Sequence, residues 1–179
     1  MPKLDLVPLL ARITQATMLI KMDVPYMPKN FPIDYPNKDM DIIVHPQQYY
    51  SVLGEIQAYV EQYPEFERLT VADTEGCGVG ARVRLTEKGK LHYQFDLADH
   101  FFDLPDWFIL EALEMKRNEG YYFVPTVEHE IIFRIVAYVN KPKPWHAEYV
   151  REHKKDVNWS DLMNLNLEDA FDEIISKKN

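Results

Sequence analysis

Four prolines within residues 23–38 constrain the fold of this chain more than any other feature of its sequence. They are Pro25, Pro28, Pro32 and Pro36. Proline lacks a backbone N–H group and fixes φ, which excludes a regular helix or a central strand in this stretch. Segments with strand-like apolar runs lie on either side, at 17–22 and 39–44. The sequence therefore predicts two strands joined by a long irregular loop.

Helical and strand-like periods divide the rest of the chain. Helical patterns cover 4–15, 46–62, 105–116, the segment from Thr126 to the break at 141–144, 146–155 and 166–175. Strand-like runs cover 67–72, 78–85 and 91–98, and Lys88-Gly89 is typical of a hairpin turn between the last two. We therefore expect an α/β (α+β) fold, with a mixed sheet core over 1–125 flanked by helices. A helical region over 126–179 is expected to pack on this core.

The amino-acid composition excludes several classes of protein and of metal site. Hydrophobic residues make up 46% of the 179 residues, which is enough for a sizeable core and excludes a disordered chain. The single cysteine, Cys77, excludes a disulfide framework and a multi-cysteine zinc site. The six histidines contain no H-x-x-x-H pair, so we expect no zinc site.

The charge balance is acidic, with 20 Lys and Arg against 29 Asp and Glu and a net charge of −9. This argues against nucleic acid as a partner, because proteins that bind it present a basic face. No apolar run approaches the roughly 20 residues of a membrane span, and the N-terminal stretch is not typical of a signal peptide. We expect a cytoplasmic location.

Asp39 and Asp41 form a D-x-D motif at the start of the apolar strand 39–44. Residues two apart in a strand share a face, so the two carboxylates lie roughly 6–7 Å apart. They repel each other by about 2–3 kcal/mol at an effective dielectric constant near 20. A divalent cation is the usual compensation where such a pair is functional, and Mg²⁺ is the common choice with phosphate substrates.

A third carboxylate, Asp96, lies on a later strand. Residues 91–97 alternate, so that Leu91, Tyr93, Phe95 and Leu97 share one face and His92, Gln94 and Asp96 share the other. A polar face on an otherwise apolar strand places Asp96 where it can join the D-x-D pair from a neighbouring strand. The three acids together predict a metal site.

This arrangement resembles the nucleotidyltransferase superfamily of the polymerase-β type, over residues 17–155. Its members carry a D-x-[DE] strand, then a helix and a strand with a third acid. The remaining motifs are similar to those of small bacterial and viral members linked to surface-glycan synthesis. These motifs are Phe95-Asp96-Leu97, Tyr122-Phe123-Val124-Pro125, Glu128-His129-Glu130 and the basic turn with Lys141, Lys143 and His146.

The resemblance implies that Asp39, Asp41 and Asp96 are metal ligands for Mg²⁺ or Mn²⁺, with Asp96 also the base for the acceptor hydroxyl. It implies transfer of a nucleotidyl or phosphoryl group from a nucleotide donor to a small-molecule acceptor, a hydroxyl or a sugar phosphate. Candidate residues for binding phosphate or lining the cleft are Lys21, Lys38, His92, Arg134, Lys143 and His146.

One departure from the superfamily leaves alternatives open. The Gly-Ser pair that precedes the D-x-D strand is replaced here by Ile20-Lys21-Met22-Asp23, in which Lys21 can supply a point charge for phosphate. A catalytically inactive binding module on the same scaffold is therefore the alternative. A glycosyltransferase that holds a nucleotide sugar through the D-x-D motif is the third hypothesis. It ranks third because those enzymes place the motif after the apolar strand, whereas here the apolar residues follow Asp39 and Asp41.

Overall fold

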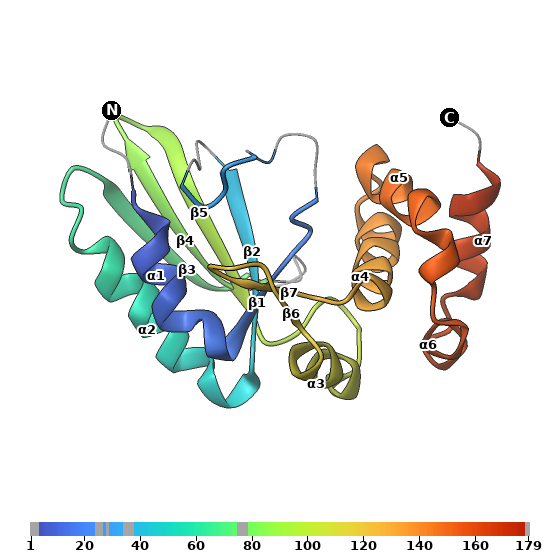
Figure 1. The fold of residues 1–179 in the computed structure, drawn as a ribbon. Helices are drawn as coiled ribbons and strands as arrows, with labels where there is room; N and C mark the ends of the chain where they lie inside the picture. The colour runs from blue at the N-terminus through green and yellow to red at the C-terminus, as the bar shows by residue number, and fades with distance from the viewer. Residues whose placement is uncertain (1–3, 24–26, 28, 34–37, 75–78, 178–179) are drawn as a thin grey trace.

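Five strands form a mixed sheet in the order β1-β2-β5-β4-β3 (Figure 1). The computed structural model describes residues 4–23, 27, 29–33, 38–74 and 79–177, with only the backbone for 38, 69, 71–74 and 79. The strands are β1 (Thr17–Ile20), β2 (Lys38–Val44), β3 (Glu67–Thr74), β4 (Val79–Glu87) and β5 (Lys90–Ala98). The β2–β5 pair is parallel and the other three pairs are antiparallel.

Seven α-helices and a small second sheet complete the described structure. The helices are α1 (Leu6–Ile13), α2 (Tyr49–Val60), α3 (Asp106–Glu114), α4 (Val127–Asn140), α5 (Pro144–Glu152), α6 (Trp159–Asn164) and α7 (Glu168–Ser176). The second sheet pairs β6 (Arg117–Asn118) with β7 (Phe123–Val124), and short 3₁₀ turns lie at Thr14–Ala16, Pro46–Gln48 and Lys154–Asp156. The predicted α+β class with a mixed sheet is confirmed.

Helices α1 and α2 cover one face of the sheet (Figure 1). The side chains that alternate toward them on β5 are Tyr93, Phe95 and Leu97, and all three are buried in the same apolar cluster as Leu10 and Ile56. Alternation along the strand thus sends one set of side chains into this core and leaves the other set for the opposite face.

The opposite face is apolar at one end and polar at the other. Ile20, Ile43 and Ala98 belong to an apolar cluster that continues through α3 and α4 to α5 and α7. This shared core packs the C-terminal helices against the sheet. Farther along the same strands, the side chains on this face are polar, and they form the candidate site.

Local signals account for the element boundaries. The side chain of Thr126 accepts a hydrogen bond from the backbone N–H of His129 and caps α4. Lys88 and Gly89 both have positive φ values, 51° and 74°, as a two-residue hairpin turn requires. The sequence also predicts a short extended piece at 121–124, which contains β7. Helix α6 and strand β6 have no counterpart in the sequence-based expectations, because they contain only six and two residues.

Much of the proline loop, at 24–26, 28 and 34–37, lies outside the described residues. Residues 29–33, which the structure does describe, form turns. Among the described helices, none combines the length and the apolar composition needed to cross a membrane.

Candidate functional site

Asp41 and Asp96 are direct partners in the parallel ladder between β2 and β5. On the other side of β5, Asp96 is the partner of Arg82 on β4. Paired residues in a sheet point to the same face, so the three side chains form a row across three strands. Asp39 lies two residues before Asp41 and shares this face.

Each of the two inner carboxylates is held by a basic side chain. Arg82 donates two hydrogen bonds to Asp96, Nε to Oδ1 at 2.8 Å and Nη2 to Oδ2 at 2.9 Å. Gln94 Nε2 donates a further bond to Asp96 Oδ2 at 3.2 Å. The ammonium group of Lys21 lies 3.0 Å from Asp41 Oδ2. These basic side chains therefore offset the repulsion between the two neighbouring carboxylates.

The pKa of Asp41 is raised above its ordinary value. Burial is the largest cause, and the negative charges of Asp39 and Asp96 raise the pKa further, while Lys21 lowers it. A raised pKa in a pocket with like-charged neighbours is a frequent property of sites that bind cations or move protons. Asp41 is therefore a carboxylate whose charge an added cation would stabilise.

A pocket of about 100 Å³, here named the acidic pocket, opens over this row of side chains. Its floor is the sheet face, and Lys141, Lys143 and His146 from the end of α4 and the start of α5 line its wall. The complete lining is Lys21, Asp39, Asp41, Arg82, Asp96, Phe101, Phe102, Ala137, Lys141, Lys143 and His146. The pocket thus sets three carboxylates opposite a set of basic groups.

Lys21 enters the acidic pocket from a strained backbone. Its φ of 58° lies in the left-handed region that favours glycine. The backbone N–H of Lys21 donates to Glu130 Oε1 at 3.0 Å, which fixes this conformation against α4. Lys21 therefore adopts a glycine-like backbone conformation while its side chain supplies a positive charge to the acidic pocket.

Arg134 lies beneath the acidic pocket with a fully buried side chain. Its guanidinium donates from Nε to Glu130 Oε1 at 2.6 Å and from Nη2 to the carbonyl oxygen of Asp23 at 3.1 Å. Its Nη1 lies 3.3 Å from Nδ1 of His146, and the Tyr149 ring stacks on the guanidinium at 4.8 Å. With these partners, Arg134 positions neighbouring groups and is not exposed for direct contact with phosphate.

Burial in this part of the structure shifts the pKa values of both His146 and Glu130. Burial, followed by the positive charges of Arg134, Lys21 and Lys143, lowers the pKa of His146 to about 3. The pKa of Glu130 is raised by burial, and Arg134 opposes that rise. His146 is therefore a neutral imidazole near neutral pH, suited to accept a hydrogen bond from Arg134.

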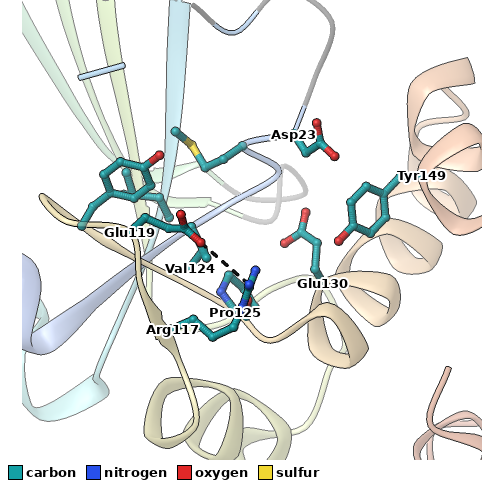
Figure 2. A pocket seen from close by; sticks show the side chains of 10 residues that line it. Asp23, Arg117, Glu119, Val124, Pro125, Glu130 and Tyr149 are labelled. Atoms are coloured by element: carbon teal, nitrogen blue, oxygen red, sulfur yellow. Dashed lines mark hydrogen bonds and ion pairs between the residues drawn. The ribbon is translucent and has the colours of Figure 1, made fainter. Parts of the chain in front are cut away.

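A second pocket, here named the hairpin pocket, lies on the other side of the Glu130–Arg134 pair and measures about 240 Å³. Figure 2 shows Glu130, Tyr149 and Asp23 converging on it from α4, α5 and the loop after β1. Arg117 and Glu119 from the β6–β7 hairpin form an ion pair at 3.8 Å on its opposite side. Its complete lining is Leu19, Met22, Asp23, Arg117, Glu119, Tyr122, Val124, Pro125, Glu130 and Tyr149.

The structure brings together Asp39, Asp41, Asp96, Lys21, Lys143 and His146 from the predicted set. His92 lies elsewhere on the sheet, buried against Phe66 and 3.3 Å from a carboxylate oxygen of Glu87. The side chain of Lys38 falls outside the described part of the structure.

The sequence-based prediction missed Arg82 as a site residue. The hairpin turn at Lys88-Gly89 predicts that β4 lies beside the strand of Asp96, but it does not identify which residue of β4 faces Asp96. Among the described residues, Asp39, Asp41 and Asp96 do not form a group whose ligand atoms all lie within 4.8 Å of one another.

Comparison with known proteins found no matching family model and no matching curated protein. Among solved structures, the chain is similar to the crystal structure of JHP933 from Helicobacter pylori, at 13% sequence identity and a TM-score of 0.49. The match covers 92% of this chain and 69% of that one. So distant a likeness carries no information about activity.

Proposed function

We propose that this chain is a metal-dependent transferase of the nucleotidyltransferase type. It moves a nucleotidyl or phosphoryl group from a nucleotide donor to a small hydroxyl or sugar-phosphate acceptor, with surface-glycan synthesis as the proposed setting. The observation that carries this proposal is the direct pairing of Asp41 with Asp96 across β2 and β5, with Asp39 on the same face and basic groups on the opposite wall.

The chemistry of the acidic pocket fits this proposal. Carboxylate oxygens are the ligands that Mg²⁺ prefers, and Asp39, Asp41 and Asp96 offer them from two adjacent strands. Mg²⁺ or Mn²⁺ bound there would neutralise the charge that develops on the transferred phosphate. Lys21, whose ammonium lies 3.0 Å from Asp41 Oδ2, would supply a positive charge beside such a phosphate group.

The other residues of the two pockets have roles that follow from their positions. Lys141 and Lys143 line the wall above the carboxylates, where they attract a phosphate group. Asp96 is the base for the acceptor hydroxyl in this scheme. The hairpin pocket, with about 240 Å³ of space and mixed polar and apolar lining, is our candidate for the acceptor site. We place the reaction in the cytoplasm, in keeping with the single cysteine of the chain.

The experiment is a titration of the purified protein with nucleoside triphosphates and nucleotide sugars, with and without Mg²⁺. We expect binding that depends on Mg²⁺, and release of pyrophosphate or nucleotide when an acceptor is added. Asp41→Asn preserves the shape of the side chain and removes one ligand, so it should weaken Mg²⁺-dependent binding at least tenfold. Asp172→Asn is the matched control on the exposed surface of α7 and should bind as the wild type does.

Two ion pairs favour the alternative of an inactive binding module. Lys21 and Arg82 already neutralise Asp41 and Asp96, and a ligand that binds through the basic wall needs no metal. If nucleotides bind equally well with and without Mg²⁺, and Asp41→Asn changes nothing, the binding module replaces the enzyme. Transfer from a nucleotide sugar with none from a nucleoside triphosphate would instead favour a glycosyltransferase.

A further inference from the structure

A second cluster of ligand-type side chains lies away from both pockets, where three helices meet. Glu111 from α3, His129 from α4 and Asp161 from α6 each offer one ligand atom, and these atoms all lie within 4.8 Å of one another. His129 and Asp161 are buried, with exposed fractions of 3% and 7%, while Glu111 borders the solvent. The cluster therefore mixes an imidazole nitrogen with carboxylate oxygens in a mostly enclosed position.

Asp161 carries the strongest sign that something is bound here. Its Oδ2 is buried and has no hydrogen-bond partner among the residues that the structure describes. A buried carboxylate oxygen without a partner is costly, since it has lost its water and gained nothing in return. A cation between these groups would give Oδ2 a partner and remove this cost.

The orientation of His129 suits a metal ligand. Its Nδ1 lies 2.8 Å from Thr126 Oγ1, the residue that caps α4. When Nδ1 donates to that hydroxyl, Nε2 keeps a lone pair for a metal ion, which would replace the Nε2–H donor of the 3.3 Å contact with Glu111 Oε1. A partner on one imidazole nitrogen that orients the other is the usual support of a metal-bound histidine.

The spacing also matches a tetrahedral ion. Ligand atoms about 2.0–2.1 Å from such an ion lie roughly 3.3–3.4 Å from one another. The 3.3 Å between His129 Nε2 and Glu111 Oε1 agrees with this value. Small side-chain movements would bring Asp161 to the same spacing within the 4.8 Å cluster.

We propose that Glu111, His129 and Asp161 bind a divalent transition-metal ion, with Zn²⁺ as the ion tested and water at a fourth position. An imidazole ligand favours Zn²⁺ over Mg²⁺. The ion fastens the short helix α6 to α3 and α4. This departs from the expectation of no zinc site, because the three ligands come from helices far apart in the sequence and no short motif announces them.

The experiment measures Zn²⁺ binding by calorimetry and the melting temperature in Zn²⁺ and in EDTA. We expect the wild type to bind one Zn²⁺ and to melt at a higher temperature with Zn²⁺ than with EDTA. Asp161→Asn and Glu111→Gln each keep the side-chain shape and should weaken Zn²⁺ binding at least tenfold. In EDTA, both variants should melt close to the wild type, because Asp161 Oδ2 has no hydrogen bond to lose and the amide oxygen of glutamine can still accept a hydrogen bond from His129 Nε2.

Controls separate this site from the acidic pocket. Asp41→Asn and Asp172→Asn should retain the Zn²⁺ response of the wild type. If the wild type takes up no stoichiometric Zn²⁺, or if both ligand variants bind it as tightly as the wild type, the proposal is wrong. If Asp161→Asn fails to fold, the half-exposed Glu111→Gln variant decides the question alone.

Discussion

Arg82 faces Asp96 across the β4–β5 ladder because the register of the hairpin shifts by one residue. Near the turn Glu87 pairs with Lys90, and the irregularity lies between Leu85 and Thr86. Beyond it the pairing moves by one position, which places Arg82 rather than its neighbour opposite the carboxylate. The bulge thus directs the two donor nitrogens of the Arg82 guanidinium toward the Asp96 carboxylate.

We expect Arg82→Met to destabilise the protein by about 3 kcal/mol, because it leaves the buried Asp96 carboxylate without its charged partner. Adding Asp96→Asn should recover part of this loss, since the unpaired charge is then gone. Chemical denaturation of the wild type, both single variants and the double variant measures the coupling. Additive effects in this cycle would contradict the pairing.

We expect Lys21→Gly to be more stable than Lys21→Ala by about 1 kcal/mol. Both variants lose the ion pair with Asp41, but only glycine adopts the φ of 58° without strain. Glu61, with an ordinary φ of −62°, is the control position, where alanine should be the more stable of the two. The same order at both positions would argue against a strained backbone at Lys21. Denaturant midpoints measure the comparison.

The pKa of His146 predicts a pH dependence of stability. Because the folded protein holds this pKa at about 3 against 6.5 for the ordinary group, the unfolded chain binds a proton between these values and the folded chain does not. Stability is therefore lost as the pH falls from about 6.5 toward 3, by up to about 1.4 kcal/mol per unit from this group. His146→Gln should remove that part of the loss while still accepting a hydrogen bond from Arg134.

The measurement is the free energy of unfolding of the wild type and His146→Gln between pH 4 and 7. The variant should gain stability relative to the wild type as the pH falls. A difference that stays constant over this range would show that protonation of His146 is not linked to unfolding.

We expect Lys116→Met to destabilise the protein by about 2 kcal/mol. The Lys116 ammonium donates to three carbonyl oxygens where the chain passes from α1 into β1, those of Thr14, Gln15 and Thr17, at 3.2, 2.6 and 3.1 Å. Methionine keeps the apolar stem and removes the donors. Lys155→Met, at an exposed position, should change the unfolding free energy by less than about 0.5 kcal/mol.

Local patterns predicted most of the fold. The alternation in β5 and the Lys88-Gly89 turn involve neighbouring residues, so both can be recognised in the sequence. The predicted strand and hairpin are confirmed. The same reasoning places Asp39 and Asp41 on one face. Helix α6 has six residues, too few for a helical period to stand out.

The partners within the site could not be predicted in the same way. The contact of Arg82 with Asp96 depends on a one-residue bulge, and simple counting from the hairpin turn would have placed Ala81 opposite Asp96. The burial of Arg134 depends on how α4 packs between the sheet and α5. Such positions follow from tertiary packing, and the spacing of residues in the sequence does not encode them.

The buried guanidinium of Arg134 connects the linings of the two pockets. It contacts His146, which lines the acidic pocket, and Tyr149 and Glu130, which line the hairpin pocket. A ligand that reorients Arg134 from one side alters what the other side presents, and thermodynamic reciprocity makes the influence mutual. If the proposed donor and acceptor bind in these two pockets, we therefore expect the affinity for each compound to change when the other is present.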